Sequence, residues 1–263
     1  RAESIFNRLL GSSRQEEAKR FLLEIFQLEK DWQKAIAIAK ELPDAASQKE
    51  IAEYYCELAA AEMMRSRLDS AAEYLDIAMQ QNRKCVRATL LLGDLRAQEN
   101  RLEEAITAWQ RIEQQDASYL ALVAQRLIEA YRRLDRKNEG LALLRGYLAH
   151  YPSLDLLDLA VQLVLESEGD EAAYRLVRDE VQRNPTLLGL ERLVSVRLGL
   201  VSPEMRPDIE LARSILQSHT RQLSRYRCGD CGFKARQFYW RCPACGGWET
   251  YSPRRSEECE LSS

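Results

Sequence analysis

Apolar residues along most of this chain recur at the three- and four-residue spacing of amphipathic helices. Within that pattern, a small residue opens an amphipathic run once every 33 to 36 positions. Glycine and proline together number 18 of 263 residues, so helix breakers are sparse. The pattern predicts an all-helical body over residues 1–224. The small residues that set the register are Ala2, Ala35, Ala71, Ala105, Gly140 and Ala173.

A period near 34 residues, with two short helices in each unit, is typical of tetratricopeptide repeats. A single helix pair cannot bury its apolar face, so successive pairs stack into a superhelix. The small residue begins the second helix, at the point where the first helix crosses it too closely for a large side chain. The register predicts hairpin turns near residues 29–31, 66–69, 100–102 and 135–138.

Polar residues mark several predicted helix starts. Ser13 and Glu16 have the spacing of a capping box, and Asp31 and Asp69 are candidate N-caps. Pro207 predicts the start of a last helix, because proline is favoured in a first turn. The apolar face expected on that helix consists of Ile209, Ala212, Ile215 and Leu216.

The N-terminal pattern is that of a second helix, with Ala2, Phe6 and Leu9 on one face. We therefore expect the chain to begin in the middle of a repeat, with further repeats upstream in a fuller protein.

The net charge of −3 is unevenly distributed. Residues 221–255 contain eight Arg and Lys against two acidic residues, a net of +6, and residues 256–263 carry three Glu. The first 220 residues therefore carry −6, and an acidic body precedes a small basic module. An acidic body repels phosphate, which argues against general binding of nucleic acid. We expect residues 225–255 to form the module and residues 256–263 an acidic disordered tail.

Four of the seven cysteines lie in two CxxCG motifs separated by ten residues. The spacing lets one tight turn place both sulfurs on one ion, and the glycine permits the positive φ that such a turn needs. Two motifs give a closed tetrahedral set of four thiolates, which predicts one structural metal ion. Zinc is the default and iron the alternative, because tetrahedral sulfur suits both. The predicted ligands are Cys228, Cys231, Cys242 and Cys245.

Seven aromatic residues crowd the same module, and two interpretations compete for them. Beside basic residues they can stack on bases, as in nucleic-acid-binding zinc ribbons. Alternatively they form a small core and a face that docks on the repeats, which we favour because the acidic body would repel phosphate. No Gly/Ser linker separates the module from the last helix, so we expect the module to be docked. The seven are Tyr226, Phe233, Phe238, Tyr239, Trp240, Trp248 and Tyr251.

The remaining chemically reactive residues do not form a catalytic pattern. His150 and His219 are the only histidines, and neither has a Ser or Cys nucleophile at a readable spacing. Cys56 and Cys85 have the pattern of small packed residues, and Cys259 lies in the polar tail. The sequence therefore predicts a protein that is not an enzyme.

Repeats followed directly by YRCGDCGF (226–233) and YWRCPAC (239–245) closely resemble the lipopolysaccharide assembly protein B (LapB) family of Gram-negative bacteria. The segments YYCELA (54–59) and RNPT (183–186) are also similar to that family. The resemblance implies cytoplasmic repeats with a rubredoxin-type metal module packed on them, and it gives the four ligand positions to Cys228, Cys231, Cys242 and Cys245. It also implies an N-terminal transmembrane anchor, which we expect to lie outside the present sequence.

For function, the resemblance implies an adaptor on the cytoplasmic side of the inner membrane. Family members restrain lipopolysaccharide synthesis by promoting degradation of the deacetylase LpxC by the membrane protease FtsH, so these two proteins are the expected partners. Two alternatives stay open from the residues alone: a nucleic-acid-binding zinc ribbon protein and a rubredoxin-type electron carrier.

Overall fold

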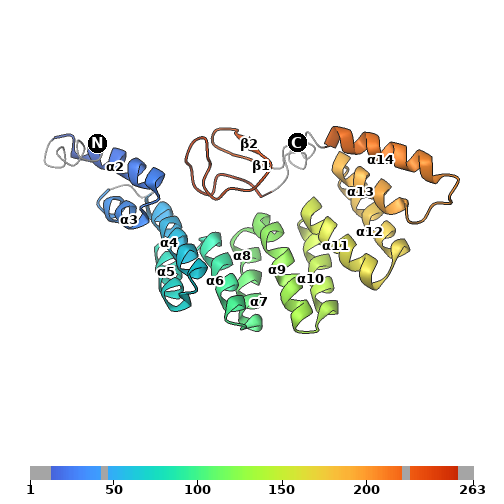
Figure 1. Ribbon diagram of the computed structural model, residues 1–263, viewed down its shortest axis with the longest axis horizontal. Coiled ribbons are helices and arrows are strands. Elements are labelled where there is room, and N and C mark those ends of the chain that lie inside the picture. The colour runs from blue at the N-terminus through green and yellow to red at the C-terminus, as the bar shows by residue number, and fades with distance from the viewer. Residues whose placement is uncertain (1–12, 43–46, 221–225, 254–263) are drawn as a thin grey trace. The chain divides into compact units, whose positions relative to one another are not determined.

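The computed structural model describes residues 13–42, 47–220 and 226–253 (Figure 1). The chain divides into two units, residues 1–115 and residues 116–263. The predictions for the N-terminal start, the boundary at residues 224 and 225, the tail and Cys259 fall outside the described residues.

In its described part, the first unit is built from helices alone. Each helix from α2 to α6 packs on the next one along the chain, and α4 also contacts α6. The helices are α2 (Gln15–Glu29), α3 (Trp32–Lys40), α4 (Ser47–Met64), α5 (Leu68–Gln81), α6 (Val86–Gln98) and α7 (Leu102–Gln110), followed by the short α8 (Ile112–Asp116).

The second unit continues the same helical pattern and then adds a small sheet. Neighbouring helices pack in pairs, and α11 contacts both α9 and α13, so alternate helices lie side by side. Its elements are η1 (Ala117–Tyr119), α9 (Leu120–Arg133), α10 (Lys137–His150), α11 (Leu154–Ser167), α12 (Asp170–Arg183), α13 (Leu187–Arg197), α14 (Arg206–Thr220), β1 (Tyr226–Arg227) and β2 (Lys234–Ala235).

The fold is therefore a tetratricopeptide-like series of helical hairpins followed by a four-cysteine module, as predicted. The described residues before 220 contain no β-strand. None of the helices within residues 13–42, 47–220 and 226–253 combines the length and the apolar character needed to cross a lipid bilayer.

The predicted hairpin turns are confirmed, and they share one backbone conformation. Lys30, Ser66, Asn100 and Asp135 each adopt a left-handed conformation, with φ between 57° and 60°. In each turn the next residue donates its N–H to a carbonyl five residues back, as Arg101 does to Arg96 at 2.8 Å. This bond closes the first helix and redirects the chain into the second. Gly169, with φ of 83°, occupies the corresponding turn between α11 and α12.

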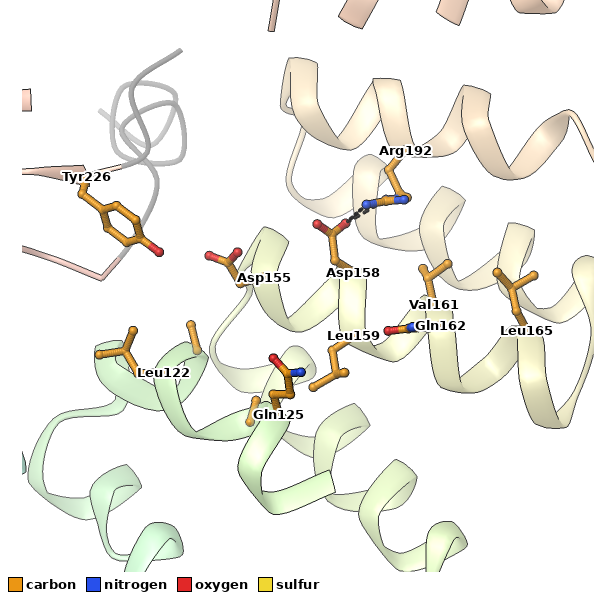
Figure 2. Close-up of a pocket in the computed structure, with 12 residues that line it drawn as sticks. Leu122, Gln125, Asp155, Asp158, Leu159, Val161, Gln162, Leu165, Arg192 and Tyr226 are labelled. Atoms are coloured by element: carbon orange, nitrogen blue, oxygen red, sulfur yellow. Dashed lines mark hydrogen bonds and ion pairs between the residues drawn. The ribbon is translucent and has the colours of Figure 1, made fainter. Parts of the chain in front are cut away.

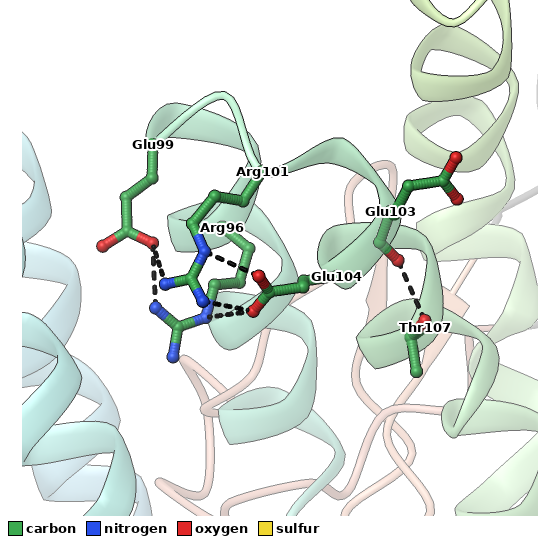
Figure 3. A network of polar contacts seen from close by, with 6 residues as sticks. All are labelled: Arg96, Glu99, Arg101, Glu103, Glu104 and Thr107. Atoms are coloured by element: carbon green, nitrogen blue, oxygen red, sulfur yellow. Dashed lines mark hydrogen bonds and ion pairs between the residues drawn. The ribbon is translucent and has the colours of Figure 1, made fainter.

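Ion pairs surround the turn between α6 and α7 (Figure 3). Arg101 pairs with Glu104 at 2.6 Å, and Arg96 pairs with Glu99 at 2.8 Å. The hydrogen bond from Arg96 lowers the pKa of Glu99; desolvation opposes this, but the charge of Arg96 and the hydrogen bond and charge of Arg101 add to the lowering. Ion pairs at the surface contribute little to stability, so the turn depends mainly on its backbone hydrogen bond.

The small residues that set the repeat register lie where the helices of a pair cross, as predicted. Ala35, Ala71, Ala105 and Ala173 are fully buried. A Cβ atom on Gly140 would lie 3.1 Å from the Ile128 side chain of α9, closer than most real contacts. The approach of the first helix therefore limits the side chain at these positions.

The predicted helix starts are only partly correct. Asp31 caps α3 by accepting a hydrogen bond from the N–H of Lys34 at 3.2 Å. Asp69 is not an N-cap, because the turn closes at Arg67 and α5 already begins at Leu68. The capping box at Ser13 is also wrong: α2 begins at Gln15, and no side chain caps it.

The last helix, α14, begins at Arg206 with Pro207 in its first turn, close to the prediction. Its apolar face is less covered than expected, since Ile215 is half exposed and none of the helix's residues is buried. The reason is that α13 is the one helix against which α14 packs extensively.

Candidate metal centre

The metal-binding motifs form two turns with the same backbone geometry. In the first, the N–H of Gly232 donates to the carbonyl of Cys228 at 3.0 Å; in the second, Gly246 donates to Cys242 at 2.9 Å. Both glycines have positive φ, 73° and 75°, as the sequence predicted. Each turn is a knuckle that presents two sulfur atoms to one point.

The two knuckles bring all four cysteines together. The sulfur atoms of Cys228, Cys231, Cys242 and Cys245 lie within 4.8 Å of one another. The Sγ–Sγ distance is 3.8 Å between Cys228 and Cys245 and 3.7 Å between Cys231 and Cys242. A tetrahedron with metal–sulfur bonds of about 2.3 Å has edges of about 3.8 Å. The cluster therefore fits one tetrahedral metal ion.

Backbone N–H groups point at these sulfurs in a repeated pattern. The sulfur of Cys228 accepts hydrogen bonds from the N–H groups of Asp230 and Cys231, and that of Cys242 accepts from Ala244 and Cys245. The outer sulfurs each accept one more, Cys231 from Phe233 and Cys245 from Gly247. Such donors stabilise the thiolate form, which is the form that binds metal.

The sulfurs differ in burial and in acidity. Cys228 and Cys242 are buried, whereas Cys231 and Cys245 are exposed. Burial raises the pKa of Cys228, but the hydrogen bonds of Thr250 and of the backbone outweigh burial and lower it to about 6. At Cys245 the backbone hydrogen bond from Gly247 lowers the pKa, but partial desolvation and the three neighbouring sulfurs outweigh it and raise the pKa to about 12. Four adjacent thiolates repel one another, and a divalent cation removes that repulsion.

Strand pairing holds the knuckles in place. β1 and β2 run antiparallel, with Tyr226 opposite Ala235, and isolated bridges join Cys228 to Tyr251 and Arg241 to Trp248. Arg241 also donates to the carbonyl of Gly246 at 3.2 Å. The buried core of the module consists of Cys228, Cys242 and Tyr251, so two of the three are themselves predicted ligands.

The aromatic residues of the module pack on the helices of the second unit. Trp240 stacks on Tyr119 of η1, with ring centroids 5.6 Å apart and an angle of 5° between the planes. Phe238 meets the same ring edge-on at 6.1 Å and Trp240 edge-on at 5.0 Å. The predicted direct contact with the helices is confirmed. Trp240 and Phe238 are committed to that contact, which argues against their use in base stacking.

The two histidines lie apart from the cysteine cluster in sequence and in contacts. His150 ends α10 and its Nδ1 lies 2.9 Å from the carbonyl oxygen of Gly146. His219 lies near the end of α14 and makes the same kind of contact with Ile215. Both rings bond to the last turns of their own helices, a role in helix termination.

Sequence reasoning placed Cys56 and Cys85 among packed residues, and both are buried. It missed that their sulfurs lie 3.8 Å apart and that Cys85 is the N-cap of α6. It also missed the buried ion pairs beside them, in which Arg87 binds Glu53 at 3.1 Å and Glu57 at 2.7 Å. The 30- and 34-residue separations of these pairs equal about one repeat, and that spacing is the signal that could have revealed them.

Comparison with known proteins agrees with both parts of the chain. Residues 226–253 match the family described as "Rubredoxin metal binding domain" (Zn_ribbon_LapB). Lipopolysaccharide assembly protein B of Escherichia coli (strain K12) is 28% identical over 266 residues, which cover 97% of this chain and 67% of that protein. The protein of the same name from Haemophilus influenzae is 27% identical, with 98% and 66% covered. The chain thus spans about two thirds of the length of these relatives, and the predicted family resemblance is confirmed.

Two solved structures are also similar. One is YrrB, described as a TPR protein with an unusual peptide-binding site, with a TM-score of 0.41 and 14% identity over 72% of this chain and 97% of that one. The other is the MamA protein, with a TM-score of 0.40 and 13% identity over 65% and 92%.

Proposed function

Because this chain resembles lipopolysaccharide assembly protein B along nearly its whole length, we propose that it acts in lipopolysaccharide assembly as a non-enzymatic adaptor. One observation carries the proposal: the similarity extends across the helical hairpins, and the family match covers the cysteine module. Stacked hairpins offer extended surfaces that bind helices or extended segments of other proteins.

Zinc is the proposed metal, held by Cys228, Cys231, Cys242 and Cys245. When bound, the ion crosslinks the two knuckles, and four protein thiolates leave no coordination position for a substrate. This role is structural, and the cluster's closed geometry supports it.

The proposed role of the metal module is to hold a surface of fixed shape against the helices. The stack of Trp240 on Tyr119 joins the module to η1. Loss of the metal would therefore change the shape of the adaptor surface without removing any chemical step. This predicts that cysteine variants fail as adaptors even though the helices remain.

The resemblance supports a more specific role, in which the adaptor presents the deacetylase LpxC to the membrane protease FtsH. It also supports attachment to the cytoplasmic face of the inner membrane through a segment outside the present sequence. Holding adaptor and protease on one membrane raises their effective concentration, so anchoring strengthens the encounter.

The test is to deplete the full-length protein in its host and follow the half-life of LpxC by pulse-chase. We expect a longer half-life, restored by the anchored wild type and not by a Cys242→Ser/Cys245→Ser variant. An unchanged half-life after depletion would contradict the proteolytic role. Restoration by the cysteine variant would contradict the role of the module.

The exposure of Cys231 and Cys245 favours one other candidate, electron transfer through bound iron. Purified protein would then contain iron and would bleach and recover its visible absorbance through cycles of reduction and oxidation. One equivalent of zinc and no such absorbance would exclude this candidate for the native protein.

A further inference from the structure

The second unit contains a groove that the metal centre does not use (Figure 2). It has a volume of about 540 Å³ and lies between α9 and α11, with α13 at one side and β1 at the other. That volume is within the range of about 300–1,000 Å³ typical of binding sites. It accommodates a few side chains of an extended segment, whereas a folded domain is too large for it.

The walls of the groove combine apolar and polar surface in similar shares. Leu122 comes from α9, and Leu159 and Leu165 come from α11. Leu165, in the last turn of α11, is 40% exposed, although the same helix buries seven other residues. Gln125 and Gln162 extend from the facing helices, and their amide groups can both donate to and accept from a peptide backbone.

The charged side chains of the groove are unbalanced. Asp155 and Asp158 line it together with one cation, Arg192. Arg192 already pairs with Asp158 at 2.7 Å, and both side chains are about one third exposed. The lining therefore has a net charge of −1, and a basic side chain fits it better than an acidic one.

The metal module supplies one wall of the groove. Figure 2 shows Tyr226 of β1 and Asp155 of α11 directed toward one another. Tyr226 is two residues before Cys228, is paired with Ala235, and meets Phe238 edge-on at 5.9 Å. Phe238 in turn contacts Tyr119, so the module's docking on η1 fixes this wall.

We infer that this groove binds an extended peptide segment of a partner protein, with a basic side chain directed at Asp155 and Asp158 and apolar side chains beside it. The inference rests on the proposed adaptor function and names the chemistry of the segment that the adaptor takes. Because Tyr226 belongs to the metal module, binding of the segment depends on that module being folded.

The test uses the whole 263-residue chain and fluorescein-labelled nonapeptide pools. The pools share a Leu three residues to either side of a central Arg, Ala or Glu, with Gly, Ser and Ala mixed elsewhere. Fluorescence anisotropy should show that the Arg pool binds roughly fivefold more tightly than the Ala pool, with the Glu pool weakest. Equal affinity for the three pools, a preference for the Glu pool, or no binding would overturn the inference.

Charge variants locate the site. An Asp155→Asn/Asp158→Asn variant changes the lining from −1 to +1 and should abolish or reverse the Arg preference, with unchanged helicity by circular dichroism. Glu210→Gln, an exposed acid on α14, is the matched control and should keep the preference. An unchanged preference in the double variant would overturn the site.

Substitutions of Tyr226 test whether the metal module contributes to peptide binding. Tyr226→Ala should weaken binding of all three pools alike, while elemental analysis still finds one equivalent of metal; Tyr226→Phe should bind nearly as wild type. Full affinity in Tyr226→Ala would overturn the wall assignment.

If peptide binding fails while depletion still lengthens the LpxC half-life, only the groove is wrong. If peptide binding succeeds while the half-life is unchanged, only the proteolytic role is wrong.

Discussion

The helical hairpins and the metal module are stabilised by different means. In the hairpins, α9 and α11 each bury seven residues along fourteen, and the backbone satisfies its own hydrogen bonds. The module has two strands of two residues, and its buried core contains just one residue, Tyr251, that is not a predicted metal ligand. Burial of apolar surface therefore accounts for the hairpins, whereas the module needs a crosslink.

Removal of the metal ligands should have the largest effect. A Cys228→Ser/Cys231→Ser variant should lose its metal and unfold residues 226–253, because structural zinc contributes on the order of 10 kcal/mol to such small domains. Near-ultraviolet circular dichroism should lose the signal of Trp240 and Trp248, while most far-ultraviolet helical signal remains.

A Cys259→Ser variant controls for the removal of a thiol and should keep one equivalent of metal. If the double variant loses its helical signal completely, the two regions are one cooperative body and the contrast between them is wrong.

The buried ion pairs give the next largest effect, within the hairpins. Arg87→Met leaves Glu53 buried without its 3.1 Å partner, which should cost about 3–5 kcal/mol in the free energy of unfolding. Replacing both partners, as in Glu53→Leu/Arg87→Met, should recover much of that loss because no unpaired charge remains. Urea unfolding followed by helical signal measures both. A double variant as unstable as the single one would show that packing, and not charge, sets the cost.

Two helical glycines, one closely packed and one with open space beside it, test the packing between helices. A Cβ atom on Gly93 would lie 2.2 Å from Nε1 of Trp109, whose N–H donates to the carbonyl of Leu90 at 3.2 Å. Gly93→Ala should therefore destabilise by about 1–3 kcal/mol despite alanine's better helix propensity. Gly146 also lies within a helix but has no atom within 4 Å of that position, so Gly146→Ala should stabilise by about 0.5–1 kcal/mol. Thermal unfolding of both variants decides, and equal shifts would refute the packing argument.

The smallest effect belongs to the hairpin turns. Ser66 has a φ of 59°, a conformation that glycine adopts without steric cost. Ser66→Gly should stabilise by about 0.5 kcal/mol, and Asn100→Gly by less, because asparagine tolerates this conformation. A decrease in melting temperature for Ser66→Gly would mean that the left-handed conformation is not the costly part of the turn.

Much of this organisation follows from periodicity in the sequence. The small residues and the four turns were predictable, because close crossing and tight redirection recur once per repeat. The four cysteines were predictable because two CxxCG motifs restrict the geometry to a shared point. The helix starts at Ser13 and Asp69 were not, because the first-turn sequence does not show where the preceding turn closes.

The groove between α9 and α11 also escaped prediction. Its residues come from α9, α11, α13 and β1, so no local motif unites Leu122, Asp158 and Tyr226. The stack of Trp240 on Tyr119 could not be predicted either, because its two residues lie 121 positions apart along the sequence. Sequence indicated that the module docks, but the partner ring depends on the packed arrangement of the second unit.

The left-handed turn residues also have a consequence for how such a chain changes in length. Lys30, Ser66, Asn100 and Asp135 share one backbone conformation at intervals of 36, 34 and 35 residues. A segment cut between two of them starts and finishes in the same local backbone conformation. Deleting or duplicating that segment joins equivalent ends, so a gene of this kind can gain or lose whole hairpins by recombination without requiring a new turn to evolve.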